Sequence, residues 1–161
     1  MTQRTPASDY RKKAERGLAD IYRQMQRAGH PKPLGDPLFG VVIILEQPVG
    51  PRVIQAISLS LDAVNFPDAY VTFTATGMLN RELRLTEPRI LVAVGSEAAR
   101  EIDELQNPLS LGKFADATPG TPFPWKRNTA GLLLPSLAPV LDDEPGKRRF
   151  WSAFLALKTL T

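Results

Sequence analysis

The sequence predicts an α/β domain with three layers in the order α/β/α. Its centre is a mostly parallel, four-stranded sheet, and an N-terminal amphipathic helix precedes the domain. Short apolar runs alternate with segments of helical periodicity, which indicates parallel strands joined by crossover helices. The four apolar runs are rich in β-branched and leucine side chains, as is typical of strands buried on both faces. The expected strands are 41–45, 69–75, 89–94 and 130–134.

The expected helices follow from apolar residues that recur every three or four positions. Before the first strand, this spacing predicts an amphipathic helix over 8–28, which Gly29 and the prolines after it end. The later helices are expected over 53–64, 78–85, 97–105 and 145–157. The segment 107–127 is rich in proline and glycine and is expected to hold at most short strands.

The charge pattern divides the chain into a basic helical arm with a hinge, 1–35, and an α/β domain, 36–161. Residues 1–30 hold seven basic and three acidic side chains, a net charge of +4, whereas the whole chain of 161 residues carries +3. Such an arm permits contact with nucleic acid or with an acidic protein, and a solvent-facing helix has the same composition. Its apolar stripe is a candidate partner-binding face, with docking onto the α/β domain as the alternative. The stripe residues are Tyr10, Leu18, Ile21 and Met25.

The composition excludes several kinds of site. Cysteine is absent and His30 is the single histidine, so disulfides, thiolate metal sites, iron–sulfur clusters and paired imidazoles are excluded. The glycine motifs of dinucleotide and phosphate loops are also missing. We therefore expect no cofactor and no metal. No apolar run reaches the roughly 20 residues of a membrane helix, and the N-terminus lacks a signal-peptide core, so we expect a cytoplasmic protein without membrane contact.

Four segments, in order along the chain, resemble motifs of the uracil-DNA glycosylase superfamily. They are 43–50 (IILEQPVG), similar to the family's first motif; 69–74 (AYVTFT), similar to a strand that ends in Thr-Asn; 87–99 (EPRILVAVGSEAA), similar to a strand-turn-helix; and 131–157, similar to the last strand, His-Pro-Ser loop and closing helix. The similarity spans residues 38–158. It implies the family's fold, in which ligands approach the carboxyl ends of the strands.

The positions that carry catalysis in this family are substituted here. Leu134 stands where the family has the histidine that stabilises the leaving base, and Phe73 stands where it has the asparagine that reads uracil. Neither side chain can donate a hydrogen bond. Glu46 and Pro48 of the first motif remain. The resemblance therefore implies a degenerate member, in which Glu46 is the candidate general base if any activity survives; a capping carboxylate near the start of the next helix is the alternative.

The resemblance also implies where DNA would be contacted. Leu137 follows the Pro-Ser dipeptide, where the family places a residue that wedges into the base stack. Phe123 and Trp125 form either a stacking platform or a core beneath a long loop. Cations at the first turn of a helix are disfavoured by its dipole, so a basic trio there points to an anionic partner. The candidate phosphate contacts are Lys113, Lys126, Arg127 and that trio, Lys147, Arg148 and Arg149.

The short chain, the helical arm and the closing aromatic helix also resemble the psi subunit of the bacterial DNA polymerase III clamp-loader assembly. By this analogy we expect a non-catalytic accessory protein of DNA replication or repair. It would act as an adaptor for replication or repair proteins such as clamp-loader subunits, with DNA as a further candidate partner. One alternative is a divergent, active DNA glycosylase that acts on uracil or another lesion. Another is a protein scaffold without affinity for DNA.

Overall fold

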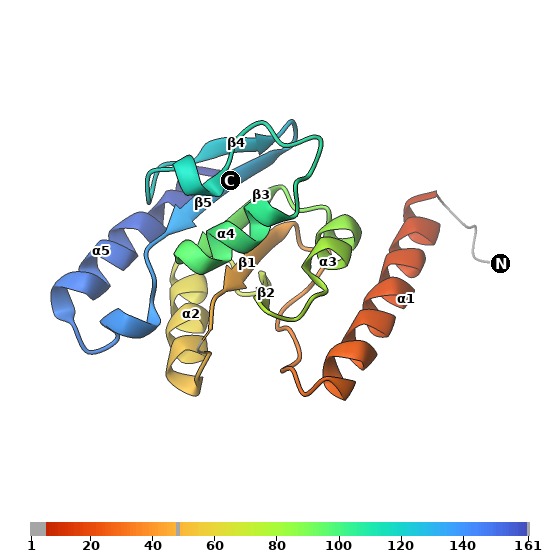
Figure 1. Cartoon of the computed structure of the whole chain (residues 1–161), viewed down its shortest axis with the longest axis horizontal. Coiled ribbons are helices and arrows are strands. Elements are labelled where there is room, and N and C mark those ends of the chain that lie inside the picture. Colours follow the sequence, from red (N-terminus) through yellow and green to blue (C-terminus); the bar gives the residue numbers. More distant parts are fainter. Residues whose placement is uncertain (1–5, 48, 161) are drawn as a thin grey trace.

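A five-stranded sheet forms the centre of the protein (Figure 1). The structure is a computed structural model that describes residues 6–47 and 49–160. The strands are β1 (Val41–Leu45), β2 (Tyr70–Phe73), β3 (Ile90–Val94), β4 (Phe123–Lys126) and β5 (Thr129–Leu134). Their order across the sheet is β2-β1-β3-β5-β4, and every neighbouring pair is parallel except β4 with β5. The expected α/β class with a mostly parallel sheet is confirmed.

Strand β4 is the difference from the four strands expected. It lies within the proline-rich segment and contains Pro124, which is why its sequence does not have the apolar pattern of the other four. β4 pairs only with β5 and so stands at the edge of the sheet. An edge strand tolerates proline because one side of its backbone takes no part in the ladder.

Helices cover both faces of the sheet and complete the three expected layers. Val41, Ile43 and Leu45 of β1 point to one face, and Val42 and Ile44 point to the other. The first face is covered by α2 (Pro51–Ala63), α5 (Glu144–Phe154) and the short helix η3 (Leu155–Leu160). The second face is covered by α3 (Leu79–Thr86), α4 (Ser96–Glu104) and the short helix η1 (Phe114–Asp116).

The N-terminal helix α1 (Pro6–Arg27) packs against α3 on its outer side (Figure 1). Leu18, Ile21 and Met25 are almost completely buried and form an apolar cluster with residues such as Leu85. The prediction that these three residues bind a partner is therefore wrong, because their apolar surface is already covered by α3. Tyr10, the fourth residue of the predicted face, remains 47% exposed.

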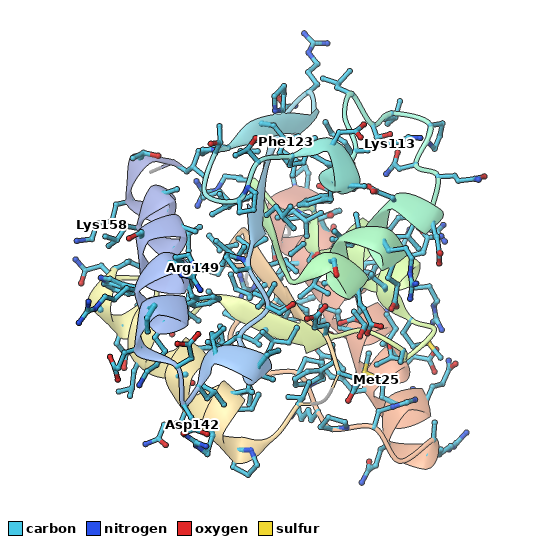
Figure 2. All side chains as sticks on the ribbon, turned by 60° about the vertical axis from the view of Figure 1, so that its left-hand side comes forward. Met25, Lys113, Phe123, Asp142, Arg149 and Lys158 are labelled. Atoms are coloured by element: carbon cyan, nitrogen blue, oxygen red, sulfur yellow. The ribbon has the colours of Figure 1, made fainter. Side chains whose placement is uncertain are left out.

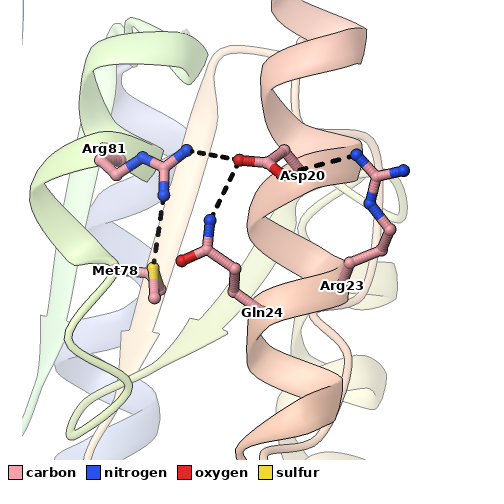
Figure 3. A network of polar contacts seen from close by, with 5 residues as sticks. All are labelled: Asp20, Arg23, Gln24, Met78 and Arg81. Carbon is pink, nitrogen blue, oxygen red and sulfur yellow. Dashed lines mark hydrogen bonds and ion pairs between the residues drawn. The ribbon is translucent and has the colours of Figure 1, made fainter.

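Polar contacts strengthen the docking of α1 on α3 (Figure 3). The carboxylate of Asp20 forms an ion pair with Arg81 of α3, with 3.0 Å between Oδ2 and Nη2. Arg23 and Gln24 contact the same carboxylate from within α1, at 3.5 and 3.0 Å. Gly17 allows the close approach of the two helices, since a Cβ atom there would lie 2.8 Å from a methyl carbon of Leu85.

The connection after α1 is bonded to the sheet and is not a free hinge. Leu34 forms an antiparallel bridge with Val71 of the edge strand β2, with N···O distances of 2.9 and 2.8 Å. At the opposite edge, the backbone N–H of Leu111 donates to the carbonyl oxygen of Trp125 in β4 at 2.7 Å. Both outer edges of the sheet therefore carry a covering segment.

The docked position of α1 predicts a large effect of truncating its buried side chains. Ile21 is completely buried, so we expect Ile21→Ala to lower the free energy of unfolding by about 2–4 kcal/mol. Urea denaturation followed by circular dichroism measures this change. Gln26→Ala, on the exposed side of α1, is the control and should change stability by less than about 0.5 kcal/mol. Equally small effects of both substitutions would mean that α1 does not dock in solution.

Candidate functional site

The carboxyl ends of the parallel strands meet at one edge of the sheet, where Glu46 follows β1. Its Oε1 atom accepts a hydrogen bond from the hydroxyl of Ser136, which lies just after β5, at 2.5 Å. Its Oε2 atom accepts one from the backbone N–H of Glu97, in the first turn of α4, at 2.9 Å. One carboxylate therefore joins three elements that are far apart in the sequence.

The position of Glu46 depends on Gly95, which connects β3 to α4. Gly95 has a φ of 98°, and a Cβ atom there would lie 2.1 Å from the carboxyl carbon of Glu46. Gly95 offers no side chain to cap α4, so the Glu46 carboxylate accepts from an N–H group that the helix leaves unpaired, where the helix dipole also favours negative charge. The alternative reading of Glu46 as a capping carboxylate is thus supported, although the helix is α4 and not the next one in the sequence.

A row of apolar side chains occupies the place where the resemblance put base recognition. Phe73, Leu45 and Leu134 end their strands, and the register aligns Leu45 with Phe73 on one side and, through Val94, with Leu134 on the other. Phe73 is 2% exposed, and the two leucines are each 1% exposed. All belong to the core beneath α2 and α5. This row has no polar atom with which to hold a base or stabilise an anion.

Leu137 lies in the same core, which disagrees with the expected wedge. It is 4% exposed, because the short helix η2 (Ala138–Val140) turns the chain directly after it. A buried leucine cannot insert between bases without rearrangement of this turn. Pro48, the other retained residue of the first motif, lies outside the described residues.

The expected stacking platform is part of the core as well. Trp125 is buried and Phe123 is half-buried, and both pack on Phe114 of η1, with ring centroids 6.3 and 4.9 Å from its ring. The ammonium of Lys126 lies 5.5 Å from the centroid of the Trp125 ring. These aromatic faces are therefore occupied by protein, as in the alternative of a core beneath the long loop.

The predicted phosphate contacts do not form one surface. Lys126 and Arg127 lie at the turn where β5 begins, whereas the trio of α5 follows its far end, and a six-residue strand is about 20 Å long. Lys113 lies beside η1, and Figure 2 shows it well apart from Arg149 on α5.

The basic trio does not need an anionic partner to offset the helix dipole. Lys147 pairs with Glu144 at 2.9 Å, and Arg149 lies 4.0 Å from the carboxylate of Asp143. Both acids stand at the start of α5, so two of the three cations already have an acidic neighbour there. For Lys147 and Arg149, the helix dipole therefore gives no argument for an external anion.

A buried carboxylate on α3 was missed by the sequence analysis. Glu82 is completely buried, and its Oε2 atom accepts hydrogen bonds from the hydroxyls of Tyr70 at 2.5 Å and Thr72 at 2.7 Å. Tyr22 of α1 donates in turn to the Tyr70 oxygen at 3.3 Å, so the cluster joins α1, β2 and α3. Burial raises the pKa of the Glu82 carboxyl. The signal in the sequence was an acid three residues after Leu79, on the inner face of an amphipathic helix.

Comparisons with known proteins leave the family open. No protein-family model matches the chain, and a search of curated proteins finds no match. Among residues 6–47 and 49–160, no helix is both long and apolar enough to cross a membrane. The part of the chain that the structure describes contains no group of three or more histidine, aspartate or glutamate side chains arranged to hold a metal ion. The resemblance to the glycosylase superfamily therefore stays a prediction from the motifs.

Proposed function

We propose that this protein is a non-catalytic accessory factor of DNA replication or repair that acts as an adaptor between proteins. The observation that supports this proposal is the apolar row formed by Leu45, Phe73 and Leu134. It closes the edge of the sheet at which a glycosylase of this layout would hold its base.

The chemistry of base excision explains why this row matters. A glycosylase holds the flipped base in a pocket and stabilises the negative charge that develops on it. Leu134 and Phe73 offer no donor, and removing one such donor typically lowers the rate by two to three powers of ten. Glu46 has both carboxylate oxygens hydrogen-bonded within the protein, which stabilises its charged form and makes it a weaker base toward water.

An adaptor needs a rigid body with exposed contact points. The bridge made by Glu46 and the docking of α1 supply the rigidity. Leu109 and Leu111 are the most exposed large apolar side chains of the described residues, at 69% and 66%. Their loop also forms one wall of an open cavity of about 630 Å³ beside α4. Exposed apolar side chains next to such a cavity are where a protein partner is best sought.

Affinity purification from the source cells, with partners identified by mass spectrometry, tests the adaptor role. We expect replication or repair proteins to be recovered with the wild type and lost with the double variant Leu109→Ser, Leu111→Ser. Leu59→Ser is the matched control, since Leu59 is 61% exposed but lies on α2. Partners that belong only to other processes would overturn the proposal.

A second arm of the same test addresses catalysis. Purified protein is incubated with uracil-containing single-stranded and double-stranded DNA, and we expect no excision of uracil. Excision by the wild type that disappears in Glu46→Gln would show that the protein is a divergent glycosylase. The adaptor proposal would then fall.

A further inference from the structure

The side of α1 opposite the docked face carries a straight strip of cations. Successive residues of an α-helix turn by about 100°, which places Lys12, Arg16, Arg23 and Arg27 within a sector of about 60°. This sector lies on the other side of the helix from the buried residues such as Ile21. At 1.5 Å per residue the strip is about 22 Å long. We call these four residues the outer strip of α1.

The charges of the outer strip are available to a partner. All four side chains belong to exposed residues, and Lys12, Arg16 and Arg27 form no ion pair with the described residues. Two acids border the strip: the exposed Asp9, which lies in the same sector three residues before Lys12, and Asp20, which Arg23 shares with Arg81 of α3 at the shorter distance of 3.0 Å (Figure 3). Arg81 neutralises Asp20 from another element, and with Asp9 counted the strip keeps an excess of three positive charges (four cations less one acid).

Two arginines of α3 lie at the junction of the two helices, to one side of the strip. A shallow cavity of about 300 Å³ lies between α1 and α3, and it is lined by Gly17, Leu85, Arg81 and the exposed Arg84. Because Arg81 pairs with Asp20, Arg84 is the arginine that adds positive charge at this junction, beside the strip and not within it.

The chemistry of the strip selects among anionic partners. A protein interface has an apolar centre, but the residues between these cations are small or polar, such as Ala19 and Gln26. A membrane-surface helix needs a free apolar face, and here Leu18 and Met25 are covered by α3. Single-stranded nucleic acid is bound through aromatic stacking, whereas Tyr22 of α1 points to Tyr70 and the exposed Tyr10 lies outside the sector of the strip. A duplex backbone requires only a row of lysine and arginine side chains.

We propose that the outer strip of α1 binds the phosphate backbone of double-stranded nucleic acid without reading its sequence. This inference rests on the proposed function, for which it supplies the contact with DNA. It places that contact on α1 and not on the residues expected from the glycosylase resemblance. α1 and α5 lie at opposite sides of the molecule in Figures 1 and 2, so the two locations can be separated by mutation.

Fluorescence anisotropy with a labelled 20-base-pair DNA duplex and the full chain, over about 50 to 200 mM salt, tests the inference. Four phosphate contacts predict that log affinity falls against log salt concentration with a slope of about −3.6. We expect the quadruple variant Lys12→Gln, Arg16→Gln, Arg23→Gln, Arg27→Gln to bind at least about 100-fold more weakly at 50 mM salt. Arg16→Gln alone should reduce the slope by about one unit. Glutamine is a good helix former, so α1 should stay folded, which circular dichroism checks.

The matched control removes the same number of charges elsewhere, through Lys126→Gln, Arg127→Gln, Arg148→Gln and Arg149→Gln. We expect this variant to bind within about 3-fold of the wild type, because these residues lie outside the strip. If both variants lose the same affinity for DNA, the effect depends only on net charge. If only the control loses affinity, DNA binds at β4 and α5. Either result would overturn the inference, as would tighter binding of single strands or no binding by the wild type. Replication partners recovered with a chain that does not bind DNA would refute only the inference and leave the adaptor role intact.

Discussion

Replacing Gly95 with alanine should lower the free energy of unfolding by about 3–5 kcal/mol, a large effect for the addition of one methyl group. Gly95 has a left-handed φ of 98°, which strains any other residue. The new Cβ atom would lie 2.1 Å from the carboxyl carbon of Glu46, so the carboxylate would have to leave its place. Its hydrogen bonds to Ser136 and to the first turn of α4 would then be lost. Urea denaturation measures the difference.

Two further variants separate the causes of this effect. Gly77 also has a positive φ, 75°, but no atom beyond its chain neighbours lies within 4 Å of an added Cβ. Gly77→Ala should therefore cost only the strain of a positive φ, about 1 kcal/mol, without the glycine-only ψ of 164° found at Gly95. In a Glu46→Ala background, Gly95→Ala should cost less than in the wild type, with a coupling of about 1–3 kcal/mol. If Gly95→Ala costs no more than Gly77→Ala, Glu46 does not occupy the position described.

Stability should fall as pH rises above about 5, because of the buried Glu82. Burial raises the folded-state pKa of this carboxyl above its ordinary value of 4.5, so the folded protein holds a proton that the unfolded chain releases. This contribution is fully present below pH 4.5 and is lost as pH rises through the folded-state pKa. The slope reaches at most about 1.4 kcal/mol per pH unit. Exposed ion-paired carboxylates such as Asp142, whose pKa is lowered by Arg52, make stability rise with pH, and they do so at lower pH than Glu82.

Glu82→Gln tests this dependence because glutamine is neutral at every pH. Its carbonyl oxygen can still accept from Tyr70 and Thr72, so we expect the variant to fold and to lose most of the slope above about pH 5. Glu104→Gln changes an exposed carboxylate on α4 and should leave the slope as it is. Urea denaturation at several pH values gives the three slopes. A wild-type stability that stays constant over this range would contradict the buried, protonated state of Glu82.

The sequence predicts the fold well where one physical signal dominates. The apolar runs that became β1, β3 and β5 are buried on both faces, so their composition alone indicates parallel strands. Strand β4 has no such signal, since its four residues include a proline and a lysine and its pairing is decided by the turn before β5. The amphipathic pattern of α1 predicts that one face is buried, but it does not say against which surface.

The candidate site was predictable only in part, because it depends on which residues the fold brings together. The identities of Leu134 and Phe73 already indicate an apolar strand end. The bridge from Glu46 to Ser136 joins positions 90 residues apart, and no local pattern reveals it. The outer strip of α1 becomes visible only when the buried face of the helix is known. The basic clusters at 126–127 and 147–149 suggest one surface in the sequence, but the length of β5 separates them in the structure.

The two covering segments at the sheet edges have a consequence for synthesis of the chain. Leu34 precedes β2 and Leu111 precedes β4, so each cover leaves the ribosome before the edge strand that it protects. An uncovered edge strand is a template for pairing with neighbouring chains, and nascent chains on one messenger are such neighbours. The order of these elements along the chain therefore makes each cover available as soon as its edge strand has been synthesised.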